Sequence, residues 1–538
     1  MTVHDDERRA HQSWLLSELS RPEAYPFPVD RIDIEETHIS MVFLAGNYAY
    51  KVKKPVNFGF LDFTTLEQRR YFCEQEVLLN QRLTEGVYLG VVPIVRIGDH
   101  LQFEGEGEVV EYAVKMRRLD FDQTLLRRLQ RDAVSTELVA ALADRLAAFY
   151  RDAARGPEID QWGTPEAVWF NIRENLEQTQ PYIGIVLAPL QHHWISVTSE
   201  RFLRERLELF QRRLAEGRIV EGHGDLHLAH IFVESEQPPR FQIVDCIEFN
   251  PRLRCGDVAV DLAFLSMDFD HHGRSDLARW FVLRSSDALD DPELPLLVHF
   301  YSVYRAHVRA KVNCFRLDEL APESDEYTAV RVQAERYIDL ATSYLVEPSE
   351  PLLILIGGLS GTGKSVLARR LGRCLGVPVH SSDVVRKELA GVALERRQEL
   401  PYGAEIYGPE LTRATYETLL ARAERTLTSG RSVILDATFL DPQWRQAAAA
   451  LAARCAVTAI LVECRCPADI VERRLRYRPQ EPGQVSEATW TIYLEQRARF
   501  GEKMESLPGL RHLVVDSSQP LPLVLDDVLA SLPLRERL

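Results

Sequence analysis

The sequence contains no run of apolar residues long enough to span a bilayer, and residues 1–9 are acidic and basic rather than apolar. We therefore expect neither a membrane span nor a signal peptide. The eight cysteines are scattered without metal-ligand spacing, and the closest pair is Cys464 and Cys466. Free thiols in a reducing compartment are the simplest interpretation, which predicts a cytoplasmic protein.

Basic residues are outnumbered by acidic ones, 64 Lys and Arg against 80 Asp and Glu, so the formal net charge is −16. This balance disfavours a surface that coats nucleic acid, although it leaves room for a small basic pocket. Low-complexity tracts are absent, and 538 residues are too many for one ordinary core. We expect two folded units, or three.

The most specific motif is GLSGTGKS at residues 358–365. It follows an apolar run at 352–356 and precedes an expected helix at 366–375, which is the strand, glycine-rich turn and helix order of a P-loop. In such a loop, backbone N–H groups and a helix N-terminus surround phosphate oxygens. The residues expected to bind the nucleotide are Gly358, Ser360, Gly361, Thr362, Gly363, Lys364 and Ser365.

Two of these side chains have separate expected roles. Lys364 reaches the β- and γ-phosphates, and the Ser365 hydroxyl holds Mg²⁺. The motif therefore predicts a protein that binds ATP and Mg²⁺.

Beyond residue 351, strand-like runs alternate with helical patterns, which predicts a parallel sheet wrapped by helices. Ligands of such sheets bind at the carboxyl ends of the strands. Asp383 and Asp436 both follow strand-like runs, so we expect them at the same edge as the P-loop. Asp436 is the expected Mg²⁺-shell aspartate, and Asp383 with Arg386 one turn later is the expected base and acceptor clamp.

A basic helix end at 472–479 carries Arg474 and Arg478, one turn apart on one face. These arginines would close over the transferring phosphoryl group as a lid. The alternative is an ordinary solvated helix face.

In the N-terminal half, a strand at 48–53 carries Lys51 and Lys53 on one face, followed by a helix at 66–83. Glu76 lies on the apolar face of that helix, and a buried carboxylate requires a cation. A strand lysine is the natural partner, although the two lysines alone would also fit a solvated face. The order of elements is that of a protein-kinase small lobe.

A second constellation begins at Asp225, in a tight loop before an expected hairpin. Twenty residues later, Asp245 leaves a strand-like run at 241–244. Two carboxylates in this layout perform phosphotransfer in kinase folds, the first by orienting and deprotonating the acceptor hydroxyl, the second by binding Mg²⁺. Glu248 and Asp257 are nearby acids without an assigned role.

His223-Gly224-Asp225 together with Asp245 resembles the aminoglycoside phosphotransferase and choline-kinase-like family, from about residue 34 to 344. The resemblance implies that Asp225 is the catalytic aspartate and Asp245 a metal ligand. It also implies that Lys51 is the phosphate lysine, with Lys53 as rival, and that Glu76 is its helix partner.

This half departs from the family at His230, which stands where the family has an asparagine that binds a second metal ion. Imidazole is a poorer Mg²⁺ ligand than an oxygen donor. The metal ligands that we expect are Ser365 and Asp436 in one half, and Asp245 with His230 in the other.

The C-terminal half resembles small P-loop kinases related to gluconate kinase, zeta-toxin-type kinases and polynucleotide 5′-kinases. The residues that carry this resemblance are Lys364, Ser365, Asp383, Arg386, Asp436, Arg474 and Arg478. In that family Ser-Asp-Ala usually follows the lid, whereas this chain has Ser486-Glu487-Ala488 at that position. The joined architecture resembles bacterial proteins that fuse an aminoglycoside phosphotransferase domain to an ATP-binding kinase domain.

Together these patterns predict α/β and α+β architecture in three parts. Residues 1–30 form a helical extension, 31–346 a two-lobed kinase-like domain with its small lobe to about 118, and 351–538 a P-loop kinase domain, with a proline-containing linker between the last two.

We expect an ATP- and Mg²⁺-dependent phosphotransferase with two nucleotide-binding units that acts on a hydroxyl of a small molecule. Two alternatives stay open: a nucleotide-sensing regulator with an N-terminal pseudokinase and a P-loop ATPase switch, or a kinase of polynucleotide 5′-hydroxyl ends, for which a small basic funnel suffices. The sequence does not indicate an oligomeric state.

Overall fold

The computed structural model describes residues 3–59, 61–392, 408–476, 488–501 and 503–538. The chain forms two compact units, which we call the first and the second unit. The first contains Met1–Val168 and Arg206–Ser302, and the second contains Trp169–Glu205 and Val303–Leu538. Within the described residues, no helix combines the length and apolar character that crossing a membrane requires.

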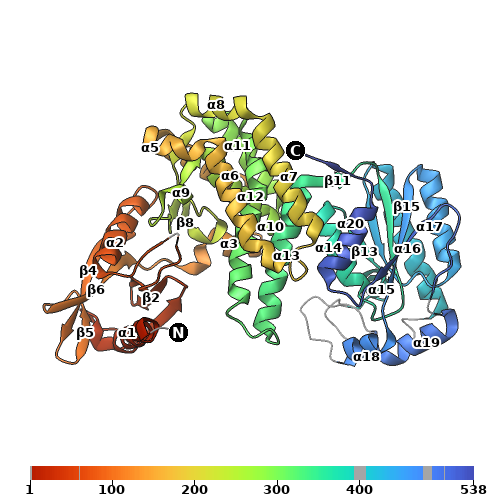
Figure 1. Ribbon diagram of the computed structural model, residues 1–538, viewed down its shortest axis with the longest axis horizontal. Helices are drawn as coiled ribbons and strands as arrows, with labels where there is room; N and C mark the ends of the chain where they lie inside the picture. Colours follow the sequence, from red (N-terminus) through yellow and green to blue (C-terminus); the bar gives the residue numbers. More distant parts are fainter. Residues whose placement is uncertain (1–2, 60, 393–407, 477–487, 502) are drawn as a thin grey trace. The chain divides into compact units, whose positions relative to one another are not determined.

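The first unit begins with a six-stranded antiparallel sheet in the order β1-β2-β3-β6-β4-β5 (Figure 1). Its strands are β1 (Ile32–Glu36), β2 (Ser40–Ala45), β3 (Tyr48–Lys53), β4 (Tyr88–Ile97), β5 (His100–Phe103) and β6 (Glu108–Arg117). Helix α2 (Leu66–Asn80) packs on β4 and β6 and begins with a capping box between Thr65 and Gln68.

The N-terminal extension belongs to this core. Helix α1 (Val3–Leu19) contributes the buried Leu15 and Leu19. Tyr25 packs against Tyr50 and Phe103, with ring centroids 5.7 and 5.2 Å away.

The remainder of the first unit is mainly helical and carries the loop of Asp225. Its helices are α3 (Leu125–Gln130), α4 (Thr136–Asp152), α5 (Pro157–Asp160), α8 (Leu207–Ala215), α9 (Pro251–Arg254), α10 (Val258–His271) and α11 (Ser275–Leu289). A small pair, β7 (Ile219–Glu221) with β10 (Cys255–Asp257), and the predicted hairpin, β8 (Ile231–Glu236) with β9 (Pro239–Ile243), flank that loop. Helices α6 (Pro165–Thr179) and α12 (Leu294–Leu317) cross from one unit into the other.

The second unit contains a five-stranded parallel sheet in the order β13-β14-β12-β15-β16. The strands are β12 (Leu352–Gly357), β13 (Val379–Ser381), β14 (Val433–Asp436), β15 (Thr458–Arg465) and β16 (Arg511–Asp516). All six residues of β12 are buried, as expected for a central parallel strand covered on both faces.

Helices surround this sheet in Figure 1. They are α14 (Lys364–Leu375), α15 (Ser382–Leu389), α16 (Pro409–Thr428), α17 (Pro442–Cys455), α18 (Ala468–Arg476), α19 (Trp490–Phe500) and α20 (Leu521–Ser531). The two-lobed arrangement of sheet and helices in the first unit and the parallel sheet in the second confirm the predicted fold class.

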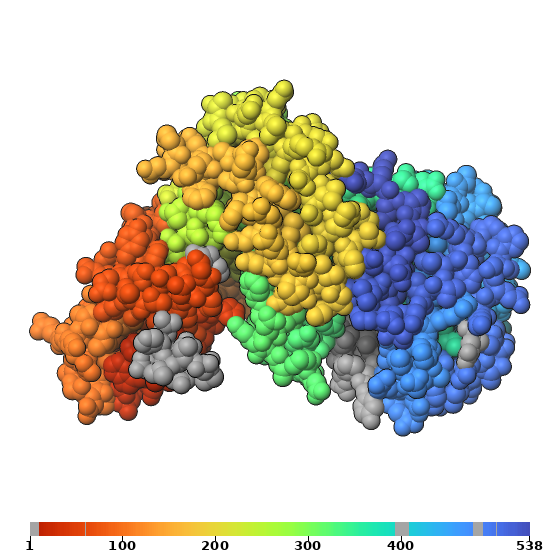
Figure 2. All heavy atoms as spheres, viewed as in Figure 1, coloured from red at the N-terminus to blue at the C-terminus, as the bar shows by residue number. Residues whose placement is uncertain are grey.

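The compact units differ from the predicted division at 346–351. Helices α7 (Pro189–Glu205) and α13 (Asp325–Leu345), expected in the kinase-like domain, pack in the second unit, α13 on α14 and α7 on α13 and α20. Figure 2 shows the yellow atoms of α7 against the dark blue atoms of α20. The expected linker also belongs to this unit, because β11 (Val346–Pro348) pairs with β17 (Leu534–Glu536).

Candidate active sites

The P-loop joins β12 to α14 in a conformation that depends on its glycines. Gly363 has φ +89° and caps α14, which begins at Lys364. A Cβ on Gly358, where φ is +136°, would lie 2.5 Å from the carbonyl oxygen of Cys464. The Lys364 ammonium donates a hydrogen bond of 2.8 Å to the Leu359 carbonyl. The loop therefore curls back on itself, with its lysine on the inner side.

Asp436 lies beside the P-loop, as predicted, because β14 ends there in register with Ile356 of β12 and Ser381 of β13. Burial raises the pKa of Asp436, and the Lys364 ammonium and the hydroxyls of Ser365 and Ser381 oppose that rise. A hydroxyl oxygen next to a carboxylate is a donor set that suits Mg²⁺. Ser365 and Asp436 are therefore the residues that would hold this ion.

Asp383 and Arg386 form the predicted pair on α15, with 3.5 Å between a guanidinium nitrogen and the carboxylate. Both line one cavity of about 950 Å³ together with Lys364, Ser365 and Asp436. A cavity of this size is at the upper end of ordinary ligand sites, which leaves room for a nucleotide and an acceptor.

Arg474 reaches the P-loop from α18. Its guanidinium donates to the Ser517 carbonyl at 2.7 Å, and a Cβ added to Gly363 would lie 3.7 Å from its Nη1. Arg474 is thus placed beside the phosphate-binding turn, where a lid arginine is expected. Arg478, its predicted companion, lies outside the described residues.

Sequence reasoning missed several residues of this cavity. Tyr416 of α16 lines the cavity beside Asp383 and Arg386, and its hydroxyl accepts the Phe439 N–H at 3.1 Å. The Gln496 side chain of α19 accepts the Ser360 N–H at 2.9 Å and so fixes the turn of the P-loop. Neither belongs to a motif, so the sequence carried no signal for them.

In the first unit, Lys51 of β3 connects two acids. Its ammonium lies 2.8 Å from Glu76 of α2 and 2.6 Å from Asp245. Burial alone lowers the pKa of Lys51, but Asp245 and Glu76 raise it above its usual value. Burial would raise the pKa of Asp245, but Lys51 and then His230 hold it below its usual range. The predicted lysine–glutamate pair is present, and Lys51 extends it to Asp245.

Lys53 occupies a different position. Its side chain is fully buried and pairs with Glu76 at 2.6 Å and with Glu248. Glu248, which the sequence left unassigned, is therefore the second partner of this buried ammonium. Lys53 anchors the strand, while Lys51 remains 13% exposed and faces Asp245.

The loop around Asp225 is held by buried groups. Asp261 of α10 accepts the N–H groups of His223 and Gly224 at 2.6 and 2.8 Å. The His223 ring donates to the Val244 carbonyl at 3.0 Å and accepts the Asp225 N–H at 3.2 Å. These contacts fix the backbone that presents the Asp225 carboxylate.

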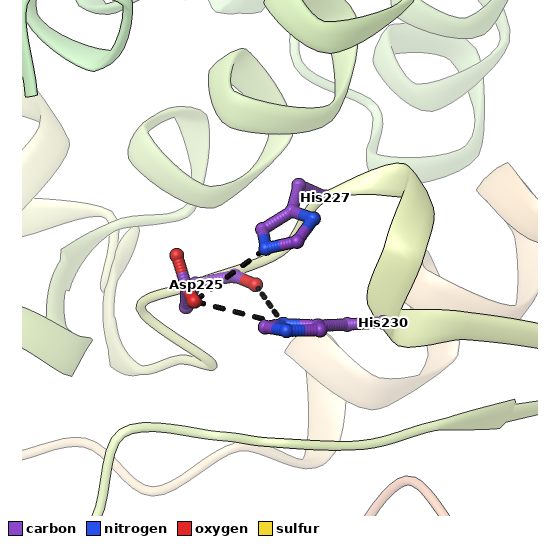
Figure 3. Close-up of side chains that lie close together, drawn as sticks. All are labelled: Asp225, His227 and His230. Atoms are coloured by element: carbon purple, nitrogen blue, oxygen red, sulfur yellow. Dashed lines mark hydrogen bonds and ion pairs between the residues drawn. The ribbon is translucent and has the colours of Figure 1, made fainter. Parts of the chain in front are cut away.

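His230 lies between Asp225, the predicted catalytic aspartate, and Asp245, the predicted metal ligand. Its Nδ1 is 3.6 Å from Asp225 Oδ2, and its Nε2 is 3.6 Å from Asp245 Oδ2. His227 Nε2 is also 3.6 Å from Asp225 Oδ2, a neighbour that motif matching did not single out (Figure 3). Burial and the adjacent His227 lower the pKa of His230 to about 4. Two imidazoles beside these carboxylates do not suit an oxygen-coordinated pair of Mg²⁺ ions.

Comparison with known proteins agrees with the second unit's architecture. Residues 353–502 match the AAA domain family AAA_33. Proteins of Mycobacterium tuberculosis and Mycobacterium bovis, both described as uncharacterized, are 36% identical over 470 residues, which is 87% of this chain and 90% of each relative. The chain belongs to the family of these mycobacterial proteins.

Among solved structures, a choline/ethanolamine kinase family protein from Mesorhizobium loti is 12% identical and covers 63% of this chain and 95% of its own, with a TM-score of 0.37. A gluconokinase from Sinorhizobium meliloti is 20% identical and covers 34% of this chain and 90% of its own, with a TM-score of 0.24.

Proposed function

We propose that this protein is an ATP- and Mg²⁺-dependent phosphotransferase that acts on a hydroxyl group of a small molecule at the P-loop cavity. The observation that carries the proposal is the placement of Asp383 and Arg386 in the same cavity as Lys364 and Asp436. A nucleotide switch needs only the phosphate and metal residues. An added carboxylate with a paired guanidinium can bind an acceptor and take the proton of its hydroxyl group.

Each group has a distinct task in this reaction. The P-loop N–H groups and Lys364 bind the phosphates, and Mg²⁺ at Ser365 and Asp436 supplies charge neutralisation when bound. Asp383 orients the acceptor hydroxyl and takes its proton as the new P–O bond forms and the bond to the leaving ADP oxygen breaks. Arg386 holds the acceptor beside Asp383, and Arg474 offsets the negative charge of the transferred group.

We also propose that the first unit is a second nucleotide-binding unit, which the chain of Glu76, Lys51 and Asp245 supports. The rival for this unit is a pseudokinase, which the imidazole of His230 favours because it replaces an oxygen ligand. In the rival account the whole protein is a nucleotide-sensing regulator.

The test is an acceptor screen with the full chain. ADP formation is measured with ATP and Mg²⁺ in the presence of sugar acids, aminoglycosides, nucleosides or 5′-hydroxyl oligonucleotides. The proposal predicts that one small-molecule class stimulates ADP formation and becomes phosphorylated. Slow ATP hydrolysis that no acceptor stimulates would support the regulator, and phosphorylation of oligonucleotides alone would support the polynucleotide kinase.

A further inference from the structure

The loop that follows β7 gathers three side chains with metal-binding atoms: Asp225, His227 and His230. Each offers one ligand atom, and these atoms all lie within 4.8 Å of one another. Figure 3 shows both imidazole rings directed at the Asp225 carboxylate, with His227 Nε2 and His230 Nδ1 each 3.6 Å from its Oδ2. Neighbouring ligands of a four-coordinate ion are about 3.3 Å apart when the bonds are about 2.0–2.1 Å long. A small inward movement of the side chains would therefore bring these three ligand atoms within bonding distance of one ion, with its fourth position left open.

A carboxylate also faces the other nitrogen of His230. Asp245 Oδ2 is 3.6 Å from Nε2, on the opposite edge of the ring from Asp225. Histidine ligands usually donate their second N–H to a carboxylate, which fixes the tautomer and orients the ring. When Nε2 carries the proton toward Asp245, Nδ1 presents its lone pair to the group of three. In the alternative tautomer Nδ1 donates to the Asp225 carbonyl, 3.0 Å away.

The backbone beneath these ligands is already fixed. Asp268 of α10 accepts the Leu228 N–H at 2.9 Å, between the two histidines in sequence. The His227 ring lies against the His230 ring, with centroids 3.8 Å apart and the ring planes tilted by 36°, and its centroid is 5.6 Å from that of the Phe264 ring. Such support lowers the cost of bringing the ligands together, because little conformational freedom is left to lose.

The donor set selects the class of ion. Two imidazoles and one carboxylate suit Zn²⁺, Mn²⁺, Fe²⁺ or Co²⁺ better than Mg²⁺. We propose that Asp225, His227 and His230 form a binding site for one divalent transition-metal ion, with Asp245 as the hydrogen-bond partner of His230. An ion held there occupies the carboxylate that would otherwise deprotonate an acceptor, so the first unit binds a transition metal in place of performing phosphotransfer. This site is independent of the P-loop cavity.

The test uses the full chain without nucleotide. A chelator first removes bound metal, the chelator is removed, and excess Mg²⁺ is then added to the buffer. Titration with Zn²⁺, followed by calorimetry, and with Co²⁺, followed by visible absorption, is expected to show one tight equivalent and nitrogen coordination of Co²⁺. His227→Ala and His230→Asn are each expected to weaken this affinity at least about tenfold, since even the loss of an outer-shell partner costs that much. The matched control is His100→Ala, since this histidine is exposed on β5 of the same unit.

Circular dichroism of the metal-free variants establishes that each is folded before its affinity is compared. Asp225→Asn provides a third variant of nearly unchanged size and is expected to weaken binding as well. Absence of a stoichiometric equivalent in the wild-type chain would overturn the proposal. So would an affinity that all three substitutions leave unchanged.

Discussion

Asp339 of α13 accepts hydrogen bonds from two arginines of α14, from Arg370 at 3.1 Å and from Arg373 at 2.7 Å. Arg370 and Asp339 are completely buried, and Gln191 of α7 donates to the same carboxylate at 3.3 Å. The helix that begins at Lys364 is therefore tied to two helices that precede the P-loop motif in sequence. The P-loop unit depends on these upstream residues for its stability.

The first prediction concerns this carboxylate. Asp339→Asn should lower the free energy of unfolding of the full chain by roughly 3–5 kcal/mol, because it removes the hydrogen-bonded counter-charge of the buried Arg370 guanidinium and leaves only Glu335, 3.4 Å away, as its ion-pair partner. Urea unfolding measures the loss. The matched control is Glu424→Gln, which breaks an exposed pair with Arg454 in the same unit and should cost less than about 1 kcal/mol. Equal stability of the two variants would contradict the role given to Asp339.

The second prediction separates the two lysines of β3. Lys53→Met should destabilise the chain more than Lys51→Met, because it leaves Glu248 buried without the ammonium that it contacts, while Glu76 keeps Lys51. Lys51→Met keeps Glu76 paired with Lys53 and affects Asp245, which is 44% exposed. Unfolding in urea ranks the two variants.

Nucleotide binding gives the complementary measurement. In a Lys364→Ala background, Lys51→Met should weaken binding of an ATP analogue to the first unit more than Lys53→Met does. The opposite order in both measurements would make Lys53 the nucleotide-binding lysine and Lys51 the structural one.

The third prediction concerns Asp383. Asp383→Asn should reduce kcat for the acceptor by roughly 10²–10⁴ and leave ATP affinity near that of the wild type, because a general base is lost and the phosphate site is kept. Steady-state kinetics with varied ATP and varied acceptor give both values. Asp527→Asn is the matched control, since Asp527 is exposed on α20 and does not line the cavity. Loss of ATP affinity with transfer preserved would make Asp383 a metal or nucleotide ligand.

The fourth prediction is a pH dependence of stability. Burial, assisted by His192 and Lys311, lowers the pKa of His307 to about 3, and its ring lies 2.8 Å from the Thr179 hydroxyl. Since the unfolded chain binds this proton near pH 6.5, the stability contributed by neutral His307 is complete above that pH and is lost as the pH falls toward 3.

Between pH 6.5 and 5 the loss from this one group is about 2 kcal/mol. His307→Gln should flatten the stability profile over that interval, whereas His100→Gln, at an exposed site, should not. Unfolding in urea at several pH values measures both slopes. Parallel profiles of stability against pH for wild type and His307→Gln would show that His307 does not cause this pH dependence.

The elements of the candidate sites differ in how far the sequence determines them. The P-loop, Asp436 and the Asp383–Arg386 pair were predictable because each lies within a few residues of a strand end, and strand order then places them at one edge. Lys51 and Lys53 were not separable, since they share one strand face. Their contacts with residues far away in sequence distinguish them, Lys53 with Glu248 and Lys51 with Asp245.

Other features depend on packing between distant segments. The placement of α7 and α13 in the second unit follows from the buried contacts of Asp339, whereas chain order alone suggested the preceding domain. His227 had a local signal in its spacing from Asp225 and His230, but its direction depends on how the loop returns past α10. The roles of Tyr416 and Gln496 likewise depend on tertiary contacts.

The central claim is that phosphotransfer occurs at the P-loop cavity, and the most direct test is ADP formation by the full chain, with ATP, Mg²⁺ and the acceptor found in the screen. Lys364→Ala and Asp225→Ala are compared with wild type, after circular dichroism has shown that both are folded. We predict that Lys364→Ala abolishes acceptor-dependent ADP formation and that Asp225→Ala retains it. Retention by Lys364→Ala together with loss in Asp225→Ala would contradict the account and place the chemistry in the first unit.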